Sequence, residues 1–207
     1  MPKVLIVSDD HCFSRCFGTK LPNGKVIWAQ PTGKLTEWIK NEVQPDFVVH
    51  AGDFENKAEW INQIANWWVI GNQDVIDGPK DIKFKIGGRS FYLTHGVGDY
   101  CFKNGRWAVN RGQICERIGA SPDFIIMGHN HIQEVDNLLR PVFINPGSLN
   151  FPRDRVEWQH QFAVLIFDEK EYTIELWGFK KGWTPAEGWA TKDYDEMVKC
   201  QRINGVF

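Results

Sequence analysis

Residues 3–11 read Lys-Val-Leu-Ile-Val-Ser-Asp-Asp-His, an apolar run rich in β-branched side chains that passes directly into polar ones. Such a run predicts a buried strand, because strands covered on both faces are apolar at nearly every position. The polar residues then lie at the carboxyl end of the strand. In layered α/β proteins this end of the sheet is where ligands bind.

The same arrangement occurs four more times along the chain. Apolar strands are predicted over residues 46–50, 67–70, 90–94 and 123–127. Each is followed by a polar loop, and these loops are Gly52-Asp53, Gly71-Asn72, His95-Gly96 and Gly128-His129-Asn130-His131. The glycines allow the backbone to turn sharply where the polar side chains must point inward.

Apolar residues at helical spacing lie between these strands and predict helices that cover the sheet. One face consists of Leu35, Trp38, Ile39 and Val43, a second of Trp60, Ile61, Ile64 and Ala65, and a third of Trp107, Ile114, Cys115 and Ile118, closed by Gly119. Strands that alternate with helices indicate an α/β layered fold.

The last third of the chain changes character. Strands are predicted over residues 142–145, 161–167 and 172–177, the last two as an antiparallel hairpin, and a further hairpin turns at Gly87-Gly88. These additions predict two packed mixed sheets with helices outside. Residues 12–31 lack clear periodicity and predict a long loop.

Composition limits the classes of function. The 207 residues are 43% hydrophobic, which fits a single domain over residues 1–207. With 24 basic and 26 acidic residues there is no overall positive field, so tight sequence-independent binding to nucleic acid is not implied. The absence of a long apolar run and the five irregularly spaced cysteines predict a cytoplasmic protein without a membrane partner or a disulfide framework. The oligomeric state is left open.

The loops after the strands together supply seven oxygen and nitrogen donors: Asp9, His11, Asp53, Asn72, His95, His129 and His131. Each alone fits an ordinary turn, cap or structural histidine. Their combination at successive strand ends predicts a metal site, and the mixture of imidazole and carboxylate suits manganese, iron or zinc better than magnesium.

The order of these motifs resembles that of the calcineurin-like metallophosphoesterases: Asp-x-His, Gly-Asp, Gly-Asn-x-Asp/Glu, a later His and Gly-His-x-His. Asn145-Pro146-Gly147-Ser148 and Pro152-Arg153 further resemble the small, lid-free phosphodiesterase branch. The resemblance covers about residues 3–153. It implies a four-layer αββα sandwich of two mixed β-sheets flanked by helices.

The resemblance also implies roles for individual residues. Two divalent metal ions are expected. Mn²⁺ is the first choice, and Fe, Zn or Ni are the alternatives. One would be held by Asp9, His11, Asp53 and His131, the other by Asp53, Asn72, His95 and His129, so that Asp53 bridges them. The catalytic group would be Asn72, Asp74 and His95, and the substrate contacts Asn72, Gln73 and Arg153. Asp74 would orient a ligand or a water, or else be an ordinary turn residue.

The implied chemistry is hydrolysis of a small phosphate ester, since two cations can hold a phosphate and activate a shared hydroxide. Many relatives carry His after Gly-Asn, but this chain has Gln73, which cannot protonate a leaving group at neutral pH. This departure favours diesters or activated esters. A phosphomonoesterase, a nucleotide pyrophosphohydrolase, a small nuclease and a non-catalytic scaffold, as in one branch of the family within a membrane-trafficking coat, remain alternatives.

Other features carry less information. His50 is predicted either to support Asp53 or to be a packed strand residue, and His160 to be a surface or strand-start residue. Arg15 is predicted either to contact phosphate or to be solvated. The protein-phosphatase branch is disfavoured, because Phe54 and Glu55 stand where it expects an Arg soon after Gly-Asp.

Overall fold

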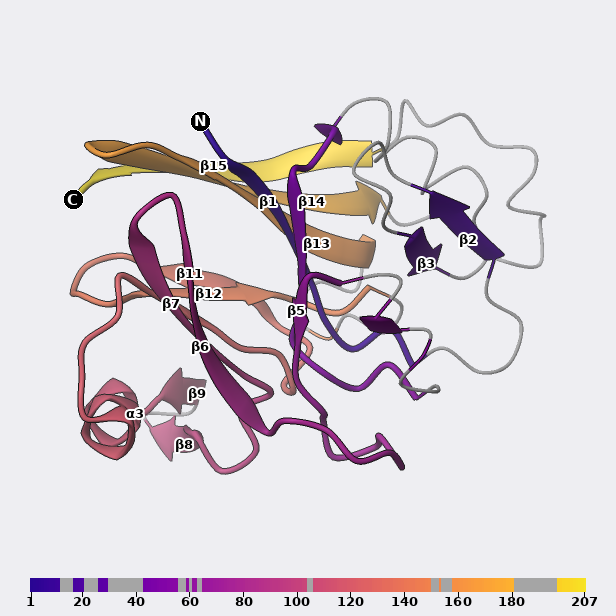
Figure 1. Cartoon of the computed structure of the whole chain (residues 1–207), viewed down its shortest axis with the longest axis horizontal. Helices are drawn as coiled ribbons and strands as arrows, with labels where there is room; N and C mark the ends of the chain where they lie inside the picture. The colour runs from indigo at the N-terminus through magenta and orange to yellow at the C-terminus, as the bar shows by residue number, and fades with distance from the viewer. Residues whose placement is uncertain are drawn as a thin grey trace.

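The computed structural model is built around two β-sheets packed face to face (Figure 1). It describes residues 1–11, 17–20, 26–29, 43–55, 59, 61–62, 65–103, 106–149, 153, 158–180 and 197–207. The larger sheet has the order β15-β14-β13-β1-β4-β5 and the smaller one β11-β12-β10-β7-β6. Both are mixed, since parallel pairs such as β1 with β4 adjoin antiparallel ones such as β1 with β13. The predicted two-sheet α/β architecture is confirmed.

The strand bounds follow the apolar runs closely. The larger sheet contains β1 (Lys3–Val7), β4 (Phe47–His50), β5 (Trp67–Trp68), β13 (Trp158–Phe167), β14 (Glu171–Lys180) and β15 (Met197–Val206). The smaller contains β6 (Asp81–Ile86), β7 (Arg89–Thr94), β10 (Phe124–Ile126), β11 (Gln133–Asp136) and β12 (Val142–Pro146). The predicted hairpin of β6 and β7 turns at Gly87 and Gly88, both with positive φ.

The core lies between the sheets, and both central strands are buried on their other face as well. Val4 and Ile6 of β1 pack into the inter-sheet core, whereas Leu5 and Val7 pack into a second cluster on the outer side. On β10, Phe124 and Ile126 face inward, and the alternate residue belongs to a third cluster. This two-sided burial explains why these strands are apolar at consecutive positions.

One helix, α3 (Arg111–Ile118), covers the smaller sheet in the described part of the chain, beside the hairpin of β8 (Tyr100–Lys103) and β9 (Arg106–Val109) (Figure 1). Ile114 and Ile118 are its buried residues, and Gly119 ends it in the left-handed conformation, as predicted. Trp107 does not belong to this helix, because it lies on β9, and that part of the helix prediction is wrong.

The second predicted helix is only partly described. Residues 59, 61 and 62 are helical, and the side chain of Ile61 is fully buried beneath the larger sheet. Residues 35–42 of the first predicted helix lie outside the described residues, although Val43 packs with Ile61. No helix among the described residues combines the length and apolar character needed to cross a bilayer.

Three further expectations need correction or extension. The segment predicted as a long loop contains a hairpin of β2 (Phe17–Lys20) and β3 (Val26–Ala29). These two strands pair with each other and join neither of the large sheets. Of the two alternatives for His160, the strand-start position is confirmed, because it is the third residue of β13, and the surface position is wrong, because it is only 4% exposed. The C-terminal β15 was not predicted from the sequence, yet it pairs along β14 at the edge of the larger sheet.

Candidate metal centre

Five strand ends, those of β1, β4, β5, β7 and β10, bring the predicted donors together at one edge of the sandwich. The strands β1 and β4 run parallel in the larger sheet, and β7 and β10 run parallel in the smaller one. The loops that follow them are joined across the sheets. The main-chain N–H of His129 donates to Oδ2 of Asp9 (3.0 Å), and that of Gly128 donates to the carbonyl of His95 (3.2 Å).

One group of donors consists of Asp9, His11 and His131. Nε2 of His131 lies 3.2 Å from Oδ1 of Asp9 and 3.3 Å from Nε2 of His11. Their three donor atoms all lie within 4.8 Å of one another. Such a triangle of one carboxylate and two imidazole nitrogens can hold a divalent cation.

A second group centres on Nε2 of His95. This atom lies 3.3 Å from Oδ2 of Asp53, 3.2 Å from Oδ1 of Asn72 and 3.3 Å from Nδ1 of His129. It is also 3.9 Å from Oδ1 of Asp9, so Asp9 is the carboxylate that lies close to both groups of donors. The structure thus brings all seven predicted donors into two adjoining groups. The assignment of Asp53 as the bridge stays a prediction.

The charges in this centre are strongly coupled. Burial alone would raise the pKa of Asp9, but the neighbouring imidazoles of His131 and His95 outweigh it and lower that pKa. The pKa of Asp53 is also lowered, because the interaction with His95 outweighs the effect of burial. Burial opposes the charged form of His95, yet Asp53 and Asp9 raise its pKa overall. Burial and the neighbouring His95 lower the pKa of His129, which favours its neutral, ligating form.

The donor set fits divalent cations. Asp9 is fully buried, and its Oδ1 accepts no hydrogen bond from the residues that the structure describes, although His131 Nε2 lies beside it. A buried carboxylate is costly unless nearby positive charge compensates it. A cation among these donors would supply that charge.

Backbone strain is concentrated in the same loops. Positive φ angles occur at Asp9 (52°), His11 (43°), Asp53 (56°), His129 (75°) and His131 (60°). Residues other than Gly rarely adopt this backbone conformation, and each instance costs roughly 1–3 kcal/mol. The surrounding hydrogen bonds therefore hold the donors in place.

Two carboxylate side chains, those of Asp74 and Glu55, support the donor loops. Asp74 accepts the main-chain N–H groups of Gly71 (2.7 Å), Asp53 (2.9 Å) and Glu55 (2.6 Å), which explains its position three residues after the Gly-Asn turn begins. Oε1 of Glu55 lies 2.5 Å from Nδ1 of His11. A carboxylate at Nδ1 keeps the proton there and leaves Nε2 of His11 turned toward the centre. Asp74 is therefore a positioning residue in this geometry.

His95 is oriented from behind as well. Its Nδ1 lies 2.7 Å from the carbonyl of Ala51, which can only accept, so the ring proton sits on Nδ1 and Nε2 faces the other donors. His50 lies beneath the same turn, where its Nδ1 accepts the N–H of Gly52 (3.1 Å) and its Nε2 is 3.5 Å from Oδ1 of Asp10. Its contacts support the turn that carries Asp53.

An unpredicted side chain, Tyr100, helps to fix the Gly-His-Asn-His loop. The hydroxyl of Tyr100 donates to the carbonyl of Gly128 (2.8 Å). The amide of Asn145 contacts that hydroxyl (2.7 Å), the same carbonyl (3.2 Å) and Oδ1 of Asn130 (2.8 Å). We call these four residues the Asn145 network. No sequence signal distinguished Tyr100, since it joins the loop only through the packing of the smaller sheet.

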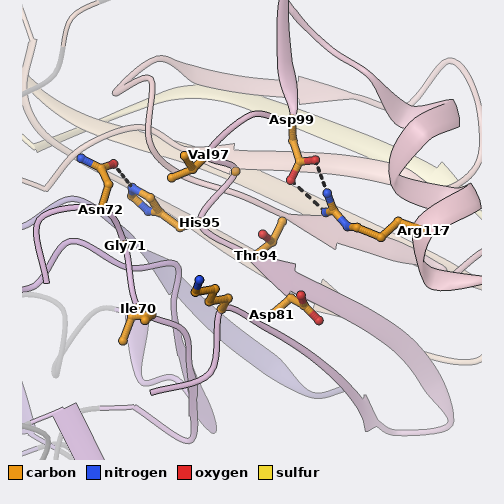
Figure 2. Close-up of a pocket in the computed structure, with 11 residues that line it drawn as sticks. Ile70, Gly71, Asn72, Asp81, Thr94, His95, Val97, Asp99 and Arg117 are labelled. Carbon is orange, nitrogen blue, oxygen red and sulfur yellow. Dashed lines mark hydrogen bonds and ion pairs between the residues drawn. The ribbon is translucent and has the colours of Figure 1, made fainter. Parts of the chain in front are cut away.

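The residues predicted to contact substrate, Asn72, Gln73 and Arg153, belong to or adjoin the donor loops. The side chains of Asn72 and Gln73 are exposed, and the N–H of Gln73 donates to Oδ1 of Asp53 (2.8 Å). Arg153 is exposed too, and its N–H donates to the carbonyl of His131 (2.9 Å). Arg15 lies outside the described residues. A cleft of about 490 Å³ opens beside Asn72 and His95 (Figure 2).

Sequence comparisons identify the family. The sequence model of the calcineurin-like phosphoesterase superfamily domain matches residues 3–170. A probable metallophosphoesterase of Mycoplasma pneumoniae is 34% identical over an alignment of 161 residues that covers 74% of this chain and 83% of that protein.

Solved structures show the same fold. A conserved protein of Streptococcus pneumoniae, described as a predicted phosphoesterase, aligns with a TM-score of 0.63 at 17% identity over 100% of this chain and 98% of that one. Vps29 of Chaetomium thermophilum aligns with a TM-score of 0.66 at 12% identity over 99% and 97%. These two likenesses are of fold alone. On the match of its sequence over residues 3–170, the chain belongs to the calcineurin-like phosphoesterase superfamily.

Proposed function

We propose that this protein hydrolyses phosphodiesters with two bound divalent ions, of which Mn²⁺ is the working metal in vitro. The observation that carries the proposal is the convergence of seven donors in two adjoining groups, with His131 Nε2 and His95 Nε2 each 3.2–3.3 Å from a carboxylate oxygen. Asp9, His11, Asp53 and His131 would hold one ion. Asp53, Asn72, His95 and His129 would hold the other.

Bound divalent ions would supply positive charge for the phosphate and lower the pKa of a water. The chain's own residues do the rest. Asp74 and Glu55 hold the donor loops in position, and exposed Asn72, Gln73 and Arg153 lie in or beside these loops, where a phosphate ester would enter. Hydrolysis forms a bond between a water oxygen and phosphorus and breaks one ester P–O bond.

The leaving oxygen must then take its proton from solvent or from a nearby water. Gln73 is exposed and can donate a hydrogen bond but no proton. Esters with good leaving groups should therefore react faster than simple alkyl monoesters. This is the reason for proposing diesters, with a phosphomonoesterase or a nucleotide pyrophosphohydrolase as the nearest alternatives.

The test compares a chromogenic diester with the matching monoester in the presence of Mn²⁺, for wild type, Asp53→Asn and Asp77→Asn. Asp77 is exposed and lies near the same loop, so its variant controls for the loss of a negative charge. We expect Asp53→Asn to lower kcat by about 100-fold or more and Asp77→Asn to leave it unchanged. Full activity in Asp53→Asn would contradict the bridging role, and a faster monoester reaction would favour the monoesterase.

A protein-interaction scaffold is the second candidate. It is favoured by the likeness in fold to Vps29 of Chaetomium thermophilum, whose name states no phosphoesterase activity. The complete donor set speaks against it. Metal analysis of the purified protein separates the two: a chain with no bound divalent ion and no Mn²⁺-dependent hydrolysis of either ester would contradict the enzyme proposal.

A further inference from the structure

A cleft lined by both apolar and polar groups begins at two of the proposed metal ligands and extends away from the metal centre. Asn72 and His95 stand at one end of it, and Asp99 and Arg117 at the other (Figure 2). Its volume is about 490 Å³. Because it adjoins the donors, a group bonded to a phosphate held there would extend into this cleft.

We infer that the cleft binds one alcohol moiety of the phosphodiester, and that this moiety is a small, uncharged, hydroxyl-rich alcohol of the glycerol type rather than a nucleoside. The inference rests on the proposed function and names its substrate class. The volume alone admits either group, so the side chains that line the cleft decide between them.

The far end of the cleft presents a compensated ion pair. The guanidinium of Arg117 donates to both carboxylate oxygens of Asp99 (2.6 and 2.9 Å) and to the hydroxyl of Tyr92 (3.0 Å). The side chain of Asp99 is only 3% exposed, and that of Arg117 is 42% exposed. Such a bidentate pair has fixed geometry and no net charge. It offers directed hydrogen bonds to hydroxyl groups but little attraction to a second phosphate.

The remaining polar groups are also balanced in charge. Lys80 and Asp81 contribute one charge of each sign to the lining, and Thr94 contributes a hydroxyl. Several donors and acceptors without net charge match an alcohol with more than one hydroxyl group. An anionic alcohol moiety would meet as much repulsion as attraction.

The described residues that line this cleft offer a nucleobase no stacking surface. Among the described residues that line the cleft there is no Phe, Tyr or Trp, and the apolar lining comes from Ile70 and Val97. Proteins that bind single bases commonly stack them on aromatic rings. The nearby ring of Tyr92 is buried in the core cluster beneath α3.

Three diesters with the same p-nitrophenolate leaving group test the inference with Mn²⁺ present. They carry methyl, glyceryl or 5′-thymidyl as the second ester group. The methyl ester measures the chemistry without the cleft. We expect wild type to prefer the glyceryl over the methyl and thymidyl esters by about tenfold in kcat/KM, mainly through KM, as one net hydrogen bond would provide.

Val97→Trp fills the cleft from a side chain that is 57% exposed, and Val75→Trp is the matched control at a position that is 95% exposed and outside the cleft. We expect Val97→Trp to reduce the ratio of kcat/KM for the glyceryl ester to that for the methyl ester to about one, and Val75→Trp to leave this ratio at its wild-type value. Lys80→Ala, at an exposed position, should weaken the preference without the added bulk.

The outcomes distinguish a wrong substrate class from a wrong proposed function. Hydrolysis of the methyl ester with equal rates for the other two, or with a preference for thymidyl, overturns the substrate class and leaves the proposed function standing. A Val97→Trp variant that slows all three esters equally also overturns it. If wild type hydrolyses none of the three with Mn²⁺, the proposed function and this inference fail together.

Discussion

The side-chain amide of Asn145 on β12 donates to the main-chain carbonyl of Gly128, 3.2 Å away, and so ties the loop of His129 and His131 to the neighbouring strand. The hydroxyl of Tyr100 shares that carbonyl. The loop that supplies two of the proposed ligands is thus held by side chains from two other segments.

Removing the Asn145 network should destabilise the protein in a non-additive way. Tyr100→Phe removes the hydrogen bonds that its hydroxyl donates to Gly128 and accepts from Asn145, and should cost about 1–2 kcal/mol of unfolding free energy. Asn145→Ala removes the amide that Tyr100, Gly128 and Asn130 share, and should cost about 2–3 kcal/mol. Denaturant unfolding of both variants and the double variant measures the coupling. Strictly additive losses would show that the two side chains act independently.

Gly71 and Gly112 should respond oppositely to Ala. A Cβ at Gly71 would overlap the carboxylate and the main-chain nitrogen of Asp53, so Gly71→Ala should displace this ligand and weaken Mn²⁺ binding roughly 10–100-fold. Gly112 lies within α3, and the nearest atom to its added Cβ would be 4.0 Å away. Gly112→Ala should therefore stabilise the protein by about 0.5–1 kcal/mol. Calorimetric titration with Mn²⁺ and denaturant unfolding check the two; unchanged Mn²⁺ affinity in Gly71→Ala would be evidence against Asp53 as a ligand.

Metal binding should weaken as the pH falls. The pKa of His95 is raised by Asp53 and Asp9 against its burial, so a proton competes with the metal at a higher pH than for an ordinary histidine. His129, with a lowered pKa, stays neutral over the same range. The Mn²⁺ affinity should fall by up to about tenfold per pH unit below the pKa of His95.

Titration calorimetry between about pH 8 and pH 6 measures this dependence. The metal-free protein should behave in the opposite sense. A raised histidine pKa contributes stability that is fully present below the unfolded value of 6.5 and is lost as the pH rises through the folded value. An Mn²⁺ affinity independent of pH would place His95 outside the ligand set.

His160 should make the protein sensitive to acid. Burial lowers its pKa to about 4, although the carbonyl of Leu149 accepts a hydrogen bond from its Nδ1. The unfolded chain binds the proton near pH 6.5, so stability should be lost between there and pH 4, by up to about 3 kcal/mol. His160→Asn keeps a donor and tolerates the positive φ of 50°, and it should flatten this part of the stability profile. Equal acid sensitivity in wild type and variant, measured by denaturant unfolding at several pH values, would contradict the prediction.

The central strands were predictable because their signal is local. Apolar runs such as residues 3–7 and 124–127 are buried on both faces, and a strand in that environment must be apolar at consecutive positions. The hairpin at Gly87-Gly88 and the end of α3 at Gly119 followed from glycine in left-handed backbone. β15 was missed, since its sequence mixes charged and apolar residues along an edge with one solvent-facing side.

The candidate donors were predictable for a related reason. Parallel neighbours end at the same edge of a sheet, so polar residues after β1, β4, β7 and β10 had to gather there. What could not be predicted were the contacts across long stretches of chain. The hydrogen bond from His129 to Asp9 spans 120 positions, and its geometry depends on how the two sheets pack.

The sequence by itself therefore determined the family, the central strands and the seven candidate donors, because these depend on local patterns and on residue types at strand ends. Tertiary structure decided that Asp9 lies close to both groups of donors, that Tyr100 and Asn145 hold the histidine loop, and that a charge-balanced cleft opens beside His95. These features arise from the packing of one sheet on the other. No local pattern encodes that packing, since each of its contacts joins residues far apart in the chain.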